Sequence, residues 1–477
     1  MILKVKRNTM KSIGLLPLFA VTGGHIVSIP FYAKSEDNQG YKKNMECIGY
    51  TDLNGIMAFQ TALYKTEDKY YIYCGSFKGP GLNILDVTDP TKPTVINFLE
   101  VCDPYEYVAQ STPKVQVADD LLIVAMGGGI PYLHGVSYED KNISGLQIYS
   151  LKEDPVHPKL LSYWSTGVEN GMGVHRFMYN GGRYLHLSAD CEGYIGQIYR
   201  ILDIEDPANP KEVSRWWMPE QYCAGMEDGT YPVGHHDEKD WPQLHGPPYV
   251  QDGIAYCGYW AGGGVLVDVH DVYHPKKLGQ IKMTPPFSGK LAGARCHTFL
   301  PLTGRPYAVL TNEGERFASW SKEVIDNSTH PGAQPLNNLH MIDVSDPSDP
   351  TLIAEFPYPE VPEDFPYPNF NFCGLECQGP FGPHNVHEPM GKPGLDQDPN
   401  RVYCCYFHAG MRVYDVSDPY YIKEIGYFIP PNPDHKYFEV PMPGPLLGTA
   451  EDCIVDDRGN IFMNCFHDGM YVLRLTV

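Results

Sequence analysis

The chain has 477 residues, 43% of them hydrophobic, with 47 Gly, 43 Pro and 34 Tyr and a formal net charge of −22 at pH 7. A strongly acidic chain without a clustered basic stripe disfavours nucleic acid and anionic membrane surfaces as partners. Helical patterns are scarce while turn residues are abundant, so the composition predicts an all-β protein of many short strands.

Residues 1–44 have the features of a leader or extension. Lys4, Lys6 and Arg7 precede a long uncharged stretch that resembles an export signal, although the bulky residues Phe31 and Tyr32 make a poor cleavage site. Gly and Pro interrupt the stretch too often for a membrane span, so we expect no integral membrane domain. We assign residues 45–477 to one folded domain and favour an exported, periplasmic location over a cytoplasmic one.

The cysteines indicate buried free thiols. Their number, 13, is odd, so at least one is unpaired in a monomer. Four of them fall within apolar strand-like segments, where a thiol behaves as a small hydrophobe. These four are Cys74, Cys257, Cys404 and Cys465. A reduced-thiol pattern of this kind conflicts with the export-like N-terminus.

An apolar strand, an Asp-Pro-type turn and a second strand recur along the chain. Proline presets the turn backbone and Asp caps it locally. The copies are 81–93, 145–158, 198–210, 264–275, 339–350, 411–422 and a shortened one at 469–477. A hairpin precedes each copy, so each unit has four strands, as one propeller blade does. The repeat therefore predicts a seven-bladed β-propeller.

The chain ends predict how the ring closes. The last copy stops at Val477 without its outer strand, and residues 45–53, ahead of the first blade, have the character of that strand. We expect this N-terminal strand to complete the seventh blade. A solenoid would instead need polar capping repeats, which the sequence lacks.

The long connections between strands indicate where a binding site lies. Most join the fourth strand to the next first strand, or the second strand to the third, and both kinds emerge on one face of a propeller. They are 101–112, 127–144, 219–243, 313–337, 358–383 and 430–449. Long loops on one side of a rigid scaffold commonly build binding sites. The aromatic segment 363–372 is a candidate lid there.

Histidines recur where the innermost strands begin. Four consecutive repeats place His175, His245, His297, and either His384 or His387 at this position. Because innermost strands converge on the channel axis, these imidazoles predict a site for a divalent metal, Fe(II) first, with Zn, Mn or Cu as alternatives. Only one of His384 and His387 is expected to be a ligand, since residues three apart on a strand face opposite sides. The alternative is a polar channel in which the histidines only form hydrogen bonds.

Other polar residues are candidates for roles around this centre. The remaining innermost strands begin with Gln60, Lys114 and Glu451. Lys114 and Glu451 are the nearest groups for proton transfer or substrate anchoring, and Gln60 is a candidate for substrate binding. Glu313 and Glu388 are candidates for carboxylates behind the metal ligands, where they would fix the imidazole tautomers.

His408 and His467 occupy matching second-strand ends in the last two blades. They are candidates for shaping a substrate pocket, and solvent-facing loop histidines are the alternative.

Several catalytic motifs are missing. The sequence has no phosphate-binding P-loop, no glycine-rich dinucleotide fingerprint between a strand and a helix, and no Gly-x-Ser-x-Gly elbow. We therefore expect no nucleotide cofactor. Acidic residues on the loop face leave carboxylate-based hydrolysis open, but no single pair stands out.

The repeated pattern, seen in "LHMIDVSDPSDP" (339–350) and "MRVYDVSDPYYI" (411–422), resembles the LVIVD-repeat β-propeller family of bacteria. That resemblance extends over most of the chain after about residue 45, through segments such as "GVHRFMYNGGRY". It implies the fold and no particular reaction. Where the resemblance leads us to expect a histidine in the second blade, this chain has Lys114. Carotenoid-cleaving oxygenases are an architectural analogy only, as seven-bladed propellers that hold iron with four histidines.

Three functional hypotheses follow. The leading one is a metal-dependent oxidoreductase, oxygenase or lyase acting on a small apolar or aromatic molecule at the four-histidine site. The second is a non-enzymatic, exported propeller that binds a protein or glycan. The third is a hydrolase that uses two facing carboxylates.

Overall fold

The computed structural model describes residues 40–77, 81–101, 114–128, 144–168, 171–223, 242–283, 294–314, 337–365, 382–433 and 447–477, with the backbone alone of strands at 19–22, 25–28 and 110–111. Most of each long connection expected on the binding face, and most of the candidate lid at 363–372, lie outside these residues, as does most of the leader.

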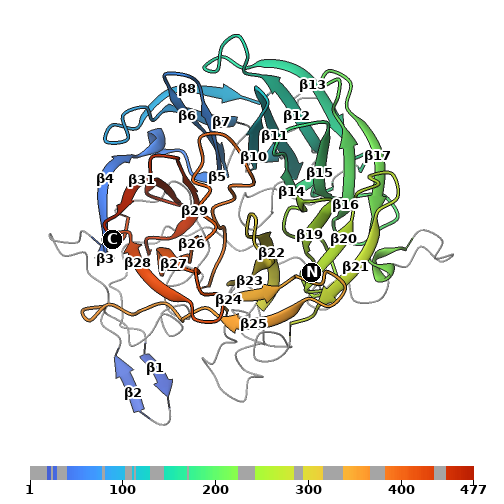
Figure 1. The fold of residues 1–477 in the computed structure, drawn as a ribbon. Helices are drawn as coiled ribbons and strands as arrows, with labels where there is room; N and C mark the ends of the chain where they lie inside the picture. Colours follow the sequence, from blue (N-terminus) through green and yellow to red (C-terminus); the bar gives the residue numbers. More distant parts are fainter. Residues whose placement is uncertain are drawn as a thin grey trace, which may run out of the picture.

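Seven antiparallel sheets surround a central channel, which confirms the predicted propeller (Figure 1). In chain order, the first four blades are β5 (Ala58–Lys65), β6 (Tyr70–Ser76), β7 (Gly81–Asp86) and β8 (Thr94–Glu100); β10 (Val115–Ala118), β11 (Leu121–Gly128), β12 (Gly145–Ser150) and β13 (Lys159–Ser165); β14 (Val174–Met178), β15 (Tyr184–Ala189), β16 (Ile198–Asp203) and β17 (Lys211–Trp216); and β18 (Tyr249–Gln251), β19 (Ile254–Gly258), β20 (Gly264–Asp268) and β21 (Lys276–Ile281).

The remaining three blades contain β22 (Ala294–Pro301), β23 (Tyr307–Gly314), β24 (Leu339–Asp343) and β25 (Thr351–Glu355); β26 (Arg401–Cys405), β27 (Met411–Asp415), β28 (Lys423–Ile429) and β3 (Tyr41–Lys43); and β29 (Ala450–Val455), β30 (Asn460–Cys465), β31 (Gly469–Leu475) and β4 (Met45–Thr51). The other described elements are β1 (Phe19–Thr22), β2 (His25–Ser28), β9 (Gln110–Ser111) and the 3-10 turns η1 (Leu53–Gly55) and η2 (Pro219–Gln221).

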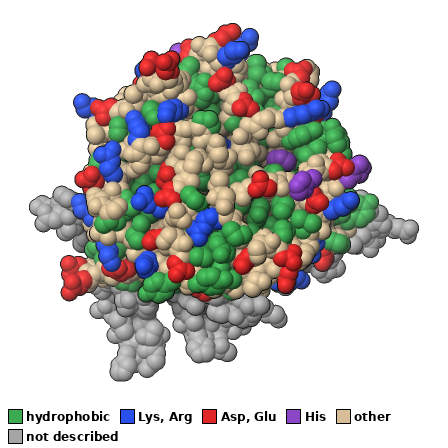
Figure 2. Space-filling model, in the orientation of Figure 1, with side chains coloured by type: hydrophobic (Ala, Val, Ile, Leu, Met, Phe, Trp, Pro, Cys, Tyr) green, Lys and Arg blue, Asp and Glu red, His purple; other side chains and the backbone are tan. Residues whose placement is uncertain are grey.

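The strands of one blade differ in burial according to their distance from the axis. In the first blade, the first five residues of β7 are buried, whereas β8 alternates exposed and half-buried positions along its whole length. Middle strands are covered by neighbouring blades on both faces and are therefore mostly apolar, with single buried polar residues such as Asn83 in β7 and Arg200 in β16. The outer strands face solvent and carry charged residues of both signs, which intersperse around the rim in Figure 2.

The ring closes as the sequence predicts. β4 pairs antiparallel with β31, so the N-terminal strand completes the seventh blade. β3, inside the segment we assigned to the extension, also pairs with β28 of the sixth blade. The propeller therefore includes residues a little before 45, and two neighbouring blades pair with β3 and β4.

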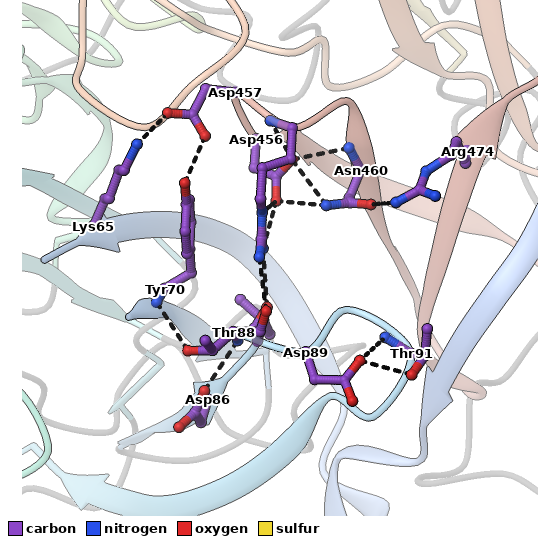
Figure 3. A network of polar contacts seen from close by, with 12 residues as sticks. Lys65, Tyr70, Asp86, Thr88, Asp89, Thr91, Asp456, Asp457, Asn460 and Arg474 are labelled. Atoms are coloured by element: carbon purple, nitrogen blue, oxygen red, sulfur yellow. Dashed lines mark hydrogen bonds and ion pairs between the residues drawn. The ribbon is translucent and has the colours of Figure 1, made fainter. Parts of the chain in front are cut away.

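Polar contacts join the last blade to the first across this closure (Figure 3). Lys65 lies 2.5 Å from the Asp457 carboxylate, and the Tyr70 hydroxyl donates a 2.8 Å hydrogen bond to its other oxygen. Arg458 donates to the backbone oxygens of Thr88 and Val87 at 2.7 and 3.0 Å. Strand pairing and side-chain contacts thus hold the same junction.

Two other expectations concern thiols and membranes. The prediction of buried thiols is confirmed, since four cysteines are buried and free: Cys74, Cys257, Cys404 and Cys465.

Within the described part of the chain, we find no helix with the length and apolar character required to cross a bilayer.

Gly469→Ala tests the closure. Gly469 has φ +74°, and a Cβ there would stand 2.1 Å from the backbone oxygen of Thr51, the last residue of β4. Gly459 has φ +80°, and a Cβ there would have no atom within 4 Å. Gly459→Ala is therefore a matched control, because it adds only the cost of a side chain at positive φ. We expect urea unfolding to show a loss of about 1 kcal/mol for the control and about 2–4 kcal/mol for Gly469→Ala. Equal losses would show that the β4 junction is not tight.

Candidate metal centre

Four histidine rings from four consecutive blades meet in the channel. The ring centroids of His175 and His245 are 4.3 Å apart, those of His245 and His297 are 4.7 Å apart, and those of His297 and His384 are 4.9 Å apart. All four side chains belong to innermost segments: β14, the residues before β18, β22, and the residues before β26. The structure therefore brings these four predicted residues together in one cluster.

Bulges in the innermost strands explain how consecutive residues reach the channel. The register with the second strand shifts between Val174 and Arg176, and again between Cys296 and Thr298, so His175 and His297 are extra residues in their ladders. The same shift occurs around Glu451. A bulge breaks the alternation of side chains and re-aims the inserted residue. This is why histidine stands at the beginning of an otherwise apolar strand.

A carboxylate faces the cluster. Glu313, on β23, has carboxylate oxygens 3.5 Å from His245 Nε2, 4.0 Å from His297 Nε2 and 3.5 Å from His384 Nε2. The ligand atoms of His245, His297 and Glu313 all lie within 4.8 Å of one another. We expected Glu313 behind the imidazoles, but the structure places it on the side where an ion would bind.

The ring nitrogens are oriented for metal binding. His384 Nδ1 donates to the backbone oxygen of Glu451 at 2.9 Å, which leaves a lone pair on Nε2, toward Glu313. His297 Nδ1 lies 2.7 Å from the Thr298 hydroxyl. Because Arg176 donates to His297 Nε2 at 3.3 Å, that nitrogen also carries a lone pair. Metal ligands typically have the second ring nitrogen held in this way.

Aromatic side chains fix two of the rings. His245 stacks on Trp260 at 4.3 Å and His384 stacks on Phe407 at 4.6 Å. His245 Nδ1 has no hydrogen-bond partner among the described residues, although it is buried. Among the described residues, His245 is therefore held by ring stacking and by its Nε2 side, and not by a hydrogen bond at Nδ1.

Burial keeps the four imidazoles neutral. Desolvation, followed by nearby positive charges, holds the pKa of His175, His245 and His297 well below the usual value. Desolvation also lowers the pKa of His384 to about 3. Neutral imidazole is the form that binds metals, so these rings need not lose a proton to do so near pH 7.

Arg176 lies beside the cluster in an ion pair that sequence patterning did not identify. Its guanidinium is 2.7 Å from the Glu388 carboxylate, and it also donates to Asn385 and His297. Strict alternation from His175 would send Arg176 to the opposite face, whereas the bulge turns it into the channel. In the sequence, the sign of this arrangement is a pair of consecutive polar residues, His175 and Arg176, at the start of an apolar strand. Glu388, expected behind a metal ligand, instead pairs with Arg176 and accepts from Tyr249.

Lys114 and Glu451 are buried close to the histidines. The Lys114 amine lies 4.0 Å above the centre of the Phe59 ring, and Phe59 contacts His384 edge-on at 5.9 Å. A cation on an aromatic face gains about 0.5–2 kcal/mol. Desolvation, then the charge of Arg176, outweighs this gain and lowers the pKa of Lys114 to about 7. Desolvation, then Glu313, raises the pKa of Glu451 well above its usual value.

His387 lies outside the cluster. Its Nε2 is 2.9 Å from the Asp396 backbone oxygen, and its Nδ1 accepts from the Val455 amide at 3.2 Å. One nitrogen thus contacts the connection that precedes β26 and the other contacts the end of β29 in the seventh blade, as expected for a residue on the opposite face from His384. Of the two alternatives, His384 is therefore the one that lies in the cluster.

The three candidates for substrate binding, Gln60, His408 and His467, do not form a single site with the histidine cluster. Gln60 lines a separate small cavity further along the channel, with Asp452, Gln116 and Lys392, which offers about 20 Å³ to the centres of water molecules. That is room for one or two waters. His408 and His467 are 2% and 5% exposed, so the alternative of solvent-facing loop histidines is wrong. Their role in a pocket stays a prediction.

Arg176→Met tests how strongly the charged pair holds the channel. The substitution leaves Glu388 buried without its cation, so we expect the free energy of unfolding to fall by about 3–5 kcal/mol. Arg183→Met is the matched control, since Arg183 also lies 2.7 Å from a carboxylate, Asp203, but its side chain is 44% exposed. The control should lose less than about 1 kcal/mol. Urea unfolding measures both, and a small loss for Arg176→Met would contradict a structural role for the pair.

Comparisons with known proteins agree with the fold and add little about chemistry. The LVIVD repeat family matches residues 70–101 and 333–356. No curated protein matches the chain. Similar solved structures include a hypothetical selenium-binding protein from Sulfolobus tokodaii (12% identity, TM-score 0.49, 87% of this chain and 94% of that one covered).

A protein from Lactobacillus plantarum (12% identity, TM-score 0.47, 88% and 96% covered) and the periplasmic gluconolactonase of Pseudomonas aeruginosa (10% identity, TM-score 0.46, 87% and 93% covered) are also similar. At such identities and scores, these likenesses carry no argument about function. Strand topology and the repeat match together show that the chain is a seven-bladed β-propeller that carries LVIVD repeats.

Proposed function

We propose that the chain is a metal-dependent enzyme, an oxidoreductase or lyase, which acts on a small apolar or aromatic molecule in the propeller channel. The observation that carries this proposal is the contact of four neutral histidine rings from four consecutive blades, of which His245, His297 and His384 are buried and His175 is half-buried. His175, His245, His297 and His384 would hold one divalent ion, with Glu313 as a further ligand.

The donor set supports Fe(II) ahead of Zn, Mn or Cu. Two imidazoles and one carboxylate, here His245, His297 and Glu313, are the set typical of non-haem Fe(II) oxygenases. Calcium and magnesium prefer oxygen ligands throughout, which this cluster does not provide. A bound ion would supply Lewis acidity and an open position for water, dioxygen or substrate.

The residues around the cluster have distinct tasks in this proposal. Glu313 contributes the negative charge that offsets a divalent cation. Arg176 would give up its 3.3 Å hydrogen bond to His297 if that nitrogen held an ion, and its ion pair with Glu388 would still balance its charge. Glu451 fixes the His384 tautomer through its backbone oxygen, and its carboxyl group can hold a proton near the centre.

The structure favours this proposal over a carboxylate-based hydrolase. Glu313 and Glu451 lie on opposite sides of one ring, 3.5 Å from His384 Nε2 and 3.2 Å from His384 Nδ1 respectively. A two-carboxylate hydrolase needs room for the scissile bond between its acids. Here the imidazole of His384 fills that space.

Elemental analysis of bound metal tests the proposal. After anaerobic incubation with Fe(II) and removal of free ion, we expect the untagged protein to hold about one iron per chain. His245→Ala and His297→Ala remove ligands, so both should lose most of it. His387→Ala is the matched control, because it removes a buried channel-side histidine outside the cluster, and should keep it. A wild-type protein that binds neither Fe(II), Zn(II) nor Mn(II) would refute the metal centre.

A further inference from the structure

Lys114 differs from the other buried lysine of the channel in having no acceptor. Its side chain is 7% exposed, and no hydrogen bond or ion pair of its amine is found among the described residues. Lys392 is 8% exposed, but its amine donates to Gln116. An amine in so buried a residue, with an aromatic ring but no acceptor among the described residues beside it, is costly to keep charged, so its retention calls for an explanation beyond packing.

The position of Lys114 directs its amine toward the candidate metal centre. It stands immediately before β10, where the innermost segment of the second blade begins, and the equivalent positions of the next four blades carry the clustered histidines. The amine lies over Phe59, which contacts His384. The second blade thus presents a primary amine where its neighbours present imidazoles.

The surroundings of Lys114 favour the neutral, nucleophilic amine. Burial disfavours its charge, and the guanidinium of Arg176 is close enough to disfavour a second positive charge. These two effects outweigh the face of Phe59 and the nearby carboxyl groups of Glu451, Glu313 and Asp452, which act in the opposite direction. Desolvation and a neighbouring cation are the two conditions that activate lysines which form Schiff bases. The lowered pKa of Lys114, about 7, agrees with this geometry.

From this placement we propose that Lys114 is a carbonyl-binding residue that forms an imine with an aldehyde or ketone substrate. The amine nitrogen bonds to the carbonyl carbon, and the carbonyl oxygen takes the amine proton to give a carbinolamine. With one proton from solvent, the hydroxyl leaves as water and a protonated imine remains. The inference rests on the proposed function for its link to catalysis, and it narrows the substrate class to carbonyl compounds.

Reductive trapping tests this assignment. The protein is treated at pH 7 with acetaldehyde, and separately with benzaldehyde, in the presence of cyanoborohydride, which reduces the imine to a stable secondary amine. Peptide mass spectrometry then gives the rate of labelling at each lysine. We expect Lys114 to be labelled at least about tenfold faster than Lys392 and the exposed Lys276.

Three controls make the outcome decisive. The preference should vanish in guanidinium-denatured protein, where all lysines share one environment. Lys114→Met should remove the fast-labelled site and leave the bound iron unchanged, because Lys114 is not a ligand. Labelling of native Lys114 no faster than that of Lys276, with either aldehyde, would overturn the inference. Iron content reports separately on the proposed function, so either idea can fail alone.

Discussion

Convergence of the seven sheets on one axis is the constraint on which the rest of this structure depends. Strand pairing of β4 with β31 makes the ring continuous, so each inner strand has a fixed neighbour on both sides. Side chains at the start of those strands can then approach one another across the channel. This geometry determines the position of the cluster formed by His175, His245, His297 and His384. Its chemistry comes from which residue types stand there.

Bulges turn this convergence into a polar centre. A regular strand would present one channel residue in two, whereas the shifts at His175, His297 and Glu451 allow successive residues to face the axis. The channel therefore contains more polar groups than alternation permits, including Arg176 and Asp452. Thr61 donates two hydrogen bonds to Asp452, at 2.7 and 2.8 Å, so even the added groups are held in place.

The electrostatics of the centre follow from burial. Imidazoles avoid a buried positive charge by staying neutral, while the charged Arg176 is balanced by Glu388 within 2.7 Å. The result is a cluster whose imidazole nitrogens offer lone pairs and whose carboxylate, Glu313, faces them. A divalent cation would satisfy both the imidazole lone pairs and the carboxylate. A hydrogen-bonded network of water molecules would satisfy them less completely.

Sequence reasoning reached the fold because the repeat is local: each strand–turn–strand unit carries its own turn residues and apolar pattern. It also reached the four histidines, since equivalent positions in a closed ring must meet. It could not place Glu313 among them, because Glu313 lies on β23, a second strand, which pattern alone does not direct to the axis. Arg176 was missed because bulges are invisible to a period-two pattern. The choice of His384 over His387 required backbone geometry that the sequence left open.

Anomalous X-ray diffraction from crystals of protein reconstituted with Fe(II), recorded on both sides of the iron absorption edge, tests the central claim most directly. The account predicts one strong anomalous peak on the channel axis, within bonding distance of Nε2 of His245 and His297 and of the Glu313 carboxylate. A peak only at surface histidines, or none in protein that has been exposed to the metal, would contradict it.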